Sequence, residues 1–360
     1  MSVEQSTSIK NNSITTVNVA VAVIHYQNQY LLGFRGTSQH QGNRYEFVGG
    51  KIDAHETAKQ ALIREVAEET GININNNTAV KLGRFHHDYG DKQVCLQVYR
   101  IKVTAQQYEQ YKNLSYGLEG QKLTWVEKAK LLAGHYDLPA ANKTILTWLQ
   151  LPAQITVTYP LSYFDAASNP MGAWLQYHHD HIAADAWVYM RTKAAGAENS
   201  IKQLLQLRPD IQAITPDNLD TDKADNAVIS RQIIANHLTQ TQLMQRSSSD
   251  AKDSMSYSAV STSLPLIVSC HNADSINAAN QLAYARLQQQ LPPVIGIFLA
   301  PVEYTQTHPD TPPLGWEAWS KLAELADMPV IGLGGLSPVM SEQAILHGGV
   351  AVAGIRQFLK

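Results

Sequence analysis

The sequence has few cysteines and no long apolar run, and both absences restrict where the protein can work. Cys95 and Cys270 are the two cysteines among 360 residues, and their wide separation does not fit a metal-binding motif. Such usage suits a reducing compartment, so we expect two small buried thiols. The polar N-terminus lacks the apolar segment of a signal peptide, and no stretch reaches the roughly 18–20 apolar residues that span a bilayer. A cytoplasmic protein without membrane contact is expected.

The sequence also lacks a strong charge of either sign. A formal net charge of −3 argues against a basic surface that binds DNA or RNA directly. With 44% hydrophobic and 16% charged residues, the composition is that of a globular protein. Its length suggests two domains, since single domains usually hold about 100–200 residues.

The first half predicts an α+β domain over residues 17–150, after a disordered tail at 1–16. Strand-like runs alternate with two helix-like stretches, and Gly71 follows the first of these as a C-terminal cap would. The expected strands are 17–26, 30–34, 45–48, 80–85, 94–103 and 123–126, and the expected helices are 56–70 and 140–149.

The second half, residues 151–360, predicts an α/β domain. After Pro152, strand-like and helix-like runs alternate in the rhythm of a parallel sheet or barrel. A Ser-rich stretch at 245–263 is too polar to pack and predicts a flexible surface loop. The expected strands begin at 155–159 and continue at 186–190, 266–269, 294–299, 330–333 and 350–353.

One face of the helix expected at 56–70 changes from apolar to acidic along its length. Its positions are Ala58, Ala61, Leu62, Glu65, Val66 and Glu69, with Glu68 beside them. Half-buried carboxylates repel one another and are costly unless a cation compensates them, and Mg²⁺ prefers such oxygen ligands. The alternative is a solvated acidic face on which Arg64 pairs with Glu68.

The residues around this helix resemble the Nudix box. Gly50, Glu56 and the run from Arg64 to Ile72 match its pattern Gx5Ex7REUxEExGU at the fixed positions. The resemblance implies a Nudix fold that holds one to three Mg²⁺ ions, or Mn²⁺, on the substrate triphosphate. It implies that Glu65, Glu68 and Glu69 bind or support these metals, with the Gly50 carbonyl as an additional ligand. It also implies that Glu56 and Arg64 brace the loop. A metal-bound water, or one activated by a glutamate, would then attack phosphorus.

Flanking motifs resemble those of the MutT-type 8-oxo-dGTP diphosphatases, over about residues 17–148. The matching segments are 45–52 (YEFVGGKI), 117–121 (GLEGQ) followed by Trp125, and 138–142 (LPAAN). The resemblance implies that Glu119 is a metal ligand or base on a mobile loop. It implies that Arg35 and Phe47 contact the nucleotide, and that Asn142 reads the purine. Outside this motif, an Asn before a helix would be interpreted as an N-cap.

Some residues depart from the family pattern or invite a different function. Val48 and His55 replace the usual Pro and Gly of the box loop, so the loop geometry or rate can differ, but no ligand is lost. His86–His87 and the tract 178–181 (HHDH) suggest transition-metal sites, although dense histidines on surface loops more often bind nothing.

The second half resembles thiamine phosphate synthase over about residues 153–359, from segments 300–304 and 311–315 and two Gly-rich segments. The resemblance implies a (β/α)₈ barrel with phosphate-binding positions at Gly334, Gly335 and Gly349. The catalytic match is poor: Gln242 replaces the magnesium-binding Asp, and His308 replaces a Lys. We expect a binding or regulatory domain without synthase activity.

Three functional hypotheses follow from these resemblances. The first is an Mg²⁺-dependent 8-oxo-dGTP diphosphatase that sanitises the nucleotide pool. The second keeps Nudix hydrolysis but directs it to another nucleotide, or to a thiamine-related pyrophosphate handed over by the second domain. The third is a ligand sensor in which the barrel binds a phosphorylated thiamine precursor and the Nudix unit responds.

Overall fold

The computed structural model describes residues 16–191, 198–216, 227–248, 263–306 and 310–360. Apart from Thr16, the tail expected at 1–16 lies outside the described residues, as do 249–262 of the Ser-rich stretch and His308. The loop expected from 245 was wrong at its start, because 245–248 complete helix α8 (Gln240–Ser248). No helix of the described segments combines the length and apolar character needed to cross a membrane.

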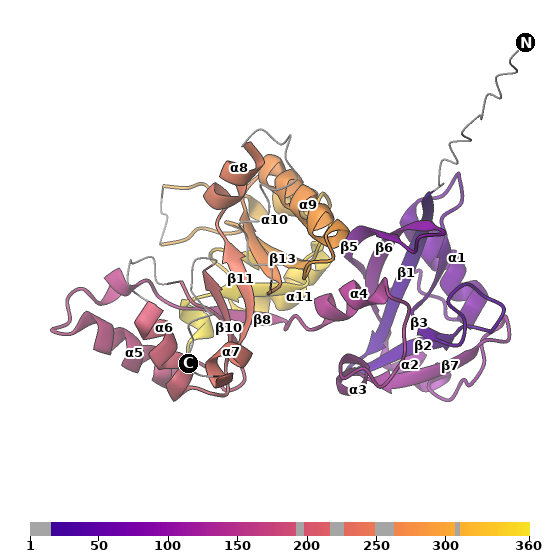
Figure 1. Cartoon of the computed structure of the whole chain (residues 1–360), viewed down its shortest axis with the longest axis horizontal. Helices are drawn as coiled ribbons and strands as arrows, with labels where there is room; N and C mark the ends of the chain where they lie inside the picture. The colour runs from indigo at the N-terminus through magenta and orange to yellow at the C-terminus, as the bar shows by residue number, and fades with distance from the viewer. Residues whose placement is uncertain (1–15, 192–197, 217–226, 249–262, 307–309) are drawn as a thin grey trace, which may run out of the picture.

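The N-terminal domain is a mixed sheet between helices (Figure 1). Strands β3, β2, β1, β6 and β5 lie in that order, with β4 paired to β1 and β7 to β2; β1 and β6 run parallel. The strands are β1 (Thr16–Tyr26), β2 (Gln29–Phe34), β3 (Tyr45–Glu46), β4 (Val48–Lys51), β5 (Ala79–Asp88), β6 (Gln93–Lys102) and β7 (Lys122–Glu127). The helices are α1 (Ala58–Thr70), α2 (Ala105–Tyr111), α3 (Lys128–Leu132) and α4 (Asn142–Leu149).

Each face of this sheet buries a separate apolar layer. On one face, Leu62 and Val66 of α1 pack with Ala20 and Ile24 of β1 in one core cluster. On the other face, Ile145 and Trp148 of α4 belong to a cluster that continues into the second domain. The acidic side of α1 is thereby held at the edge of the sheet, next to β4.

The C-terminal domain is a closed barrel of parallel strands, β8 to β15, in the order β10-β11-β12-β13-β14-β15-β8-β9. Its strands are β8 (Gln154–Val157), β9 (Trp187–Tyr189), β10 (Gln212–Pro216), β11 (Ile233–Leu238), β12 (Leu266–Cys270), β13 (Val294–Leu299), β14 (Val330–Leu333) and β15 (Ala351–Gly354). Besides α8, its helices are α5 (Pro170–His181), α6 (Glu198–Leu207), α7 (Ala227–Gln232), α9 (Ala273–Gln288), α10 (Gly315–Ala323) and α11 (Ser341–Leu346). The expected barrel fold is confirmed.

Gly349 was wrong as a phosphate-binding position. It lies between α11 and the first residue of β15, at the N-terminal end of the barrel strands, whereas ligands of such barrels bind at the C-terminal end. Its amide donates to the Ala344 carbonyl at 2.8 Å, and a Cβ there would meet the Trp319 ring at 2.8 Å. This glycine therefore permits close packing. Gly334 and Gly335 do follow β14 at its C-terminal end.

The N-terminal domain is attached to the barrel at the N-terminal ends of its strands (Figure 1). The buried Trp148 donates from its indole N–H to the carbonyl of Val294, the first residue of β13, at 3.1 Å. Arg84 of β5 donates to both carboxylate oxygens of Asp327, just before β14, at 3.0 and 3.1 Å. The C-terminal mouth of the barrel consequently opens away from the N-terminal domain.

Candidate active site

Helix α1 has a strong signal at each end, and these fix the positions of its glutamates. Thr57 and Gln60 form a capping box in which each side chain bonds the other's backbone N–H. Gly71 ends the helix in the left-handed conformation, with a φ of 75° that favours glycine. The helix therefore starts two residues later than the sequence suggests, and its C-terminal end is the expected one.

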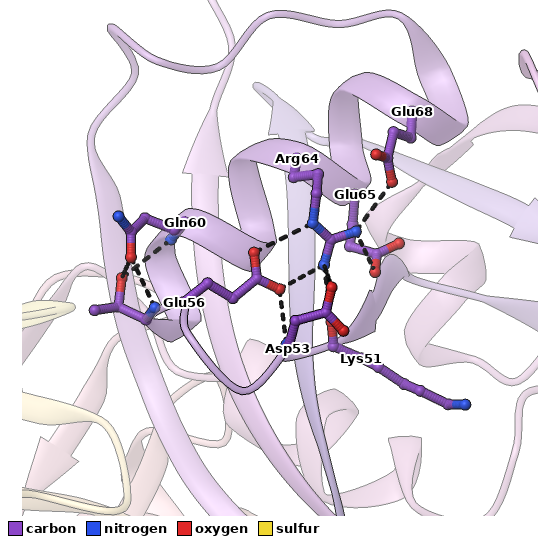
Figure 2. A network of polar contacts seen from close by, with 8 residues as sticks. Lys51, Asp53, Glu56, Gln60, Arg64, Glu65 and Glu68 are labelled. Atoms are coloured by element: carbon purple, nitrogen blue, oxygen red, sulfur yellow. Dashed lines mark hydrogen bonds and ion pairs between the residues drawn. The ribbon is translucent and has the colours of Figure 1, made fainter.

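The guanidinium of Arg64 lies at the centre of a polar network that joins α1 to the preceding loop (Figure 2). It donates to the Glu56 carboxylate and to the Lys51 carbonyl, the latter at 3.0 Å. It also donates to Glu65 at 2.9 Å and to Glu68 at 3.0 Å. Both the expected Arg64–Glu56 brace and the alternative Arg64–Glu68 pair are present. Hydrogen bonding to Arg64 lowers the pKa of Glu56.

Gly50 brings the backbone of β4 against the carboxylate of Glu65. A Cβ at Gly50 would stand 2.2–2.3 Å from the carboxyl atoms of Glu65, a distance that atoms cannot share. The absent side chain therefore makes room for the Glu65 carboxylate beside the β4 backbone. This is the juxtaposition that a shared set of oxygen ligands would require.

Glu69 is the most perturbed acid of this region. Burial, followed by the charges of Glu46, Glu65 and Glu119, raises the pKa of Glu69 to about 8. Burial is also the main reason that the pKa values of Glu65 and Glu46 are raised, although Arg64 and Arg35 respectively oppose the shift. Glu46, Glu65 and Glu69 are thus partly buried near one another, with the exposed Glu119 close by, and their charge is only partly compensated by Arg64 and Arg35.

The loop that carries Glu119 is tied to the end of α1. The backbone N–H of Leu118 donates to the Glu69 carbonyl at 2.8 Å, and the Gln121 side-chain amide donates to the same oxygen at 3.1 Å. The loop closes on itself through a bond from the Gly117 N–H to the Gln121 carbonyl at 2.8 Å. These bonds place Glu119 near Glu69.

The acidic side chains are of the type that binds a hard divalent cation, but they are not arranged as a complete set of metal ligands. Among the described residues, no three His, Cys, Asp or Glu side chains are already grouped as metal ligands. Arg64 instead takes the carboxylates of Glu65 and Glu68. Carboxylate oxygens are what Mg²⁺ and Mn²⁺ prefer, and a cation would offset the repulsion that raises the pKa of Glu69.

A second group of side chains leads from the acids toward Asn142. Glu46 forms an ion pair with Arg35, and its negative charge helps to raise the pKa of Glu69. Tyr89 lies near Arg35, Glu46 and the backbone of Ala141. Sequence reasoning missed Glu46 and Tyr89 as site residues. Glu46 could have been found from its place in the segment YEFVGGKI, whereas no local signal marks Tyr89.

Asn142 reaches this region because its segment is fastened to β3. The Tyr45 N–H donates to the Asp137 carbonyl at 2.8 Å, and Arg44 bonds the Asp137 carboxylate at 3.0 Å. Asn142 begins α4 and is 6% exposed, while Ala141 is the N-cap, so the N-cap interpretation is wrong. Phe47, expected to contact the nucleotide, is 4% exposed and belongs to the core.

Two other polar candidates, His178 and Gln242, have structural roles. His178 is buried in α5, where its ring bonds the Tyr159 N–H and the Trp174 carbonyl at 2.9 and 2.7 Å, so it does not lie on a surface loop. Gln242 forms a capping box with Thr239 at the start of α8. In the described part of the barrel, Gly334 and Gly335 keep positive φ values of 96° and 71° beside Glu303.

Comparison with known proteins gives a separate match for each domain. The family model of the NUDIX domain matches residues 19–148, and that of thiamine monophosphate synthase matches residues 183–358. The 8-oxo-dGTP diphosphatase of Haemophilus influenzae is 34% identical over 36% of this chain and 88% of its own length. The Escherichia coli enzyme of the same name is 28% identical over 37% and 96%.

Two further similarities concern the N-terminal domain. The CTP pyrophosphohydrolase of Escherichia coli is 39% identical over 16% of this chain and 42% of its own length. A solved structure from work on the MutT proteins of Aliivibrio salmonicida and Vibrio cholerae is 29% identical to this chain, with a TM-score of 0.29. The match covers 38% of this chain and 100% of the solved chain.

Proposed function

Since this chain belongs to the Nudix hydrolase family, we propose that its N-terminal domain hydrolyses 8-oxo-dGTP to 8-oxo-dGMP and pyrophosphate, with Mg²⁺. Nudix hydrolases need a divalent metal, and the carboxylate cluster around Glu69 is the observation that carries the proposal. Its negative charge is poorly compensated, so it suits a divalent cation that also binds the phosphate oxygens of the substrate. Relatives named for this activity match almost their whole length.

Glu65, Glu68, Glu69 and Glu119, with the Gly50 carbonyl, are the groups proposed to hold the metal. Bound there, the metal would neutralise phosphate oxygens and lower the pKa of a coordinated water. Arg64 bonds Glu65, Glu68 and the Lys51 carbonyl of β4, so it ties these carboxylates to β4. Glu56, bonded to the Asp53 N–H at 2.8 Å, holds Arg64 in turn.

The reaction adds one water across the anhydride between the α and β phosphates. The water oxygen bonds to phosphorus, the bridging P–O bond breaks, and the electron pair leaves with the departing phosphate oxygen. A carboxylate must accept the water proton. As the alternative to a role as metal ligand, Glu119 is the proposed acceptor, because its charge acts on Glu69 within the carboxylate cluster while its own side chain is exposed.

Asn142 is proposed to read the purine, next to Arg35 and Tyr89. An amide can donate to O6 of 8-oxoguanine and accept from its N7–H, whereas N7 of guanine is an acceptor and would face the amide oxygen. Leaving that pair unsatisfied costs about 1–3 kcal/mol. Asn142 is almost fully buried, so water would not replace the lost bond cheaply.

The test is a panel of 8-oxo-dGTP, dGTP, CTP and thiamine pyrophosphate, with product analysis. We expect the highest kcat/KM for 8-oxo-dGTP and release of pyrophosphate. Orthophosphate as the sole phosphate product would contradict the cleavage position. A preference for CTP would instead support the alternative of a different nucleotide, which the similarity to a CTP pyrophosphohydrolase favours.

For the barrel, we propose binding of a phosphate ester without synthesis of thiamine phosphate. Consecutive positive φ values at Gly334 and Gly335 turn the backbone at the ligand end of β14, where amides can face an anion. Gln242, in the place of the expected acid, is occupied in a helix cap. The full chain should bind thiamine phosphate in calorimetry yet show no turnover from the pyrimidine pyrophosphate and thiazole phosphate; steady turnover would overturn this proposal.

A further inference from the structure

Four basic side chains gather at one end of the N-terminal sheet, away from the acidic helix. His25 of β1 is paired with Lys102 of β6 on one side and with Tyr30 of β2 on the other, where the two rings stack at 5.4 Å. Lys128 reaches the same end of the sheet because its backbone N–H donates to the carbonyl of Asn28, in the β1–β2 turn, at 2.8 Å.

Arg100 completes this group, which we call the basic cluster (His25, Arg100, Lys102 and Lys128). Arg100 pairs with Val23 and Val80 in the neighbouring strands, both of which belong to the core layer on the α4 side. Its guanidinium reaches the carbonyl of Val350, just before β15, at 3.5 Å. The cluster therefore lies at the seam with the barrel, on the opposite sheet face from α1.

The positive charge of the cluster has no acidic partner among the described residues. None of the four side chains forms an ion pair with a carboxylate in this part of the chain, whereas nearby Lys130 pairs with Glu127 at 3.1 Å. His25, Arg100 and Lys128 are only partly exposed, so water solvates them incompletely. Half-buried cations without compensation are costly, and an anion would relieve that cost.

The basic groups lower one another's pKa values. Burial first, with Arg100, Lys102 and Lys128 contributing, lowers the pKa of His25 to about 4. Burial and then the charge of Arg100 lower the pKa of Lys128. Burial also lowers the pKa of Arg100. An anion placed among these groups would favour their charged forms.

We propose that the basic cluster binds a small oxyanion of the phosphate class at the seam between the two domains. A guanidinium and an ammonium suit the several oxygens of such an anion, since charge-assisted bonds to phosphate are strong. The ligand would contact β1, β6 and α3 of one domain beside the Val350 carbonyl of the other. The site is distinct from the carboxylate cluster and does not depend on the reaction proposed for it.

The test uses the full chain in EDTA, so that phosphate is not recruited by metal at the acidic helix. Thermal unfolding is followed with increasing inorganic phosphate, and with sodium chloride at matched ionic strength. We expect phosphate to raise the Tm more than chloride does. Lys128→Met should weaken the apparent phosphate affinity about tenfold. Lys130→Met, on the same short helix but paired with Glu127, is the matched control and should respond like the unmodified protein.

A second measurement needs no variant. In NMR titrations of the histidine rings, phosphate should raise the pKa of His25 from about 4, because a bound anion stabilises the imidazolium. Parallel titrations with pyrophosphate and dGMP distinguish a free inorganic ion from the phosphate of a nucleotide. An unmoved His25, or equal phosphate responses in the Lys128→Met and Lys130→Met variants, would overturn the proposal.

Discussion

Glu69 makes the stability of the metal-free protein depend on pH. Its folded pKa of about 8 exceeds the ordinary value of 4.5, so the folded state binds more protons than the unfolded state between these values. As far as Glu69 contributes, the free energy of unfolding should therefore be greatest below pH 4.5, fall between pH 4.5 and about 8, and change little above that. In Glu69→Gln this decrease in the free energy of unfolding, on the order of 2–4 kcal/mol, should be absent. The measurement is urea unfolding in EDTA at several pH values.

The control for this effect is Glu68→Gln on the same helix, because Glu68 is exposed. It should keep the pH dependence of the unmodified protein. If Glu69→Gln shows the same slope between pH 5 and 8 as the other two proteins, the proposed protonation of Glu69 is wrong.

Glu65 and Glu68 should affect turnover far more than folding. Glu65→Gln and Glu68→Gln each remove one negative charge from the proposed metal site while preserving size, so we expect kcat to fall roughly 10²-fold or more. Circular dichroism and Tm should remain close to those of the unmodified protein. Activity within a factor of a few would remove the altered residue from the metal site.

Asn142 should control the choice between purines rather than the chemistry. In Asn142→Ala, the ratio of kcat/KM for 8-oxo-dGTP to that for dGTP should fall about 10-fold or more, since the lost hydrogen bonds differ between the two bases by about 1–3 kcal/mol. Turnover of dGTP should fall less. An unchanged ratio would show that another group reads the base.

At the scale of elements, β4 and α1 meet through two adjacent glycines with different requirements. A Cβ at Gly50 would meet the flexible end of Glu65, so Gly50→Ala should displace that carboxylate and cut kcat at least about tenfold while the fold survives. At Gly49, φ is 147° and a Cβ would stand 2.1 Å from the Ala20 carbonyl.

Gly49→Ala is therefore the contrasting variant. Because backbone rather than a movable side chain opposes the added atom, it should lower the free energy of unfolding by several kcal/mol. Tm and activity, measured for both variants, separate the two cases. Equal stability losses would mean that Gly50 has only a packing role.

The elements with strong local signals are those that the sequence predicted well. Strands β13 and β14 were expected at the residues where they occur, because short apolar runs bounded by turns mark buried parallel strands. Helices α2 and α3 were not expected, since both are short and α2 has no buried residue. The acidic site was predicted from the spacing of the glutamates along α1. Tyr89, in contrast, approaches the site through tertiary contacts that no local sequence pattern shows.

For the whole molecule, Asp327 links the two domains. It accepts both bonds from Arg84 and lies 3.8 Å from the Lys81 ammonium, so Asp327→Ala would leave two cations at the seam without their partner. We expect a loss of about 1–2 kcal/mol in the first unfolding transition, seen by calorimetry. Glu317→Ala, which breaks an exposed pair with Lys321, should change stability by less than about 0.5 kcal/mol. Equal effects would contradict the role of Asp327.

The attachment of the domains could not be predicted from the sequence. Gly349 illustrates the reason: its Gly-Gly pair resembles a phosphate loop, and only the position of β15 relative to α11 shows that it belongs to the other end of the barrel. Likewise, Trp148 and Arg84 have the pattern of ordinary helix and strand residues, and their partners lie 146 and 243 residues away along the chain.

The attachment at the N-terminal ends of β13, β14 and β15 bears on what fusing the two domains can achieve. A molecule released from the barrel mouth enters solvent on the side away from the N-terminal domain, so it mixes with the cellular pool before any encounter with the carboxylate cluster. In an isotope-dilution experiment, adding the same compound without label to the solution would therefore fully dilute a labelled compound released by the barrel. Direct handover between the domains, one form of the alternative function, is therefore disfavoured by this arrangement.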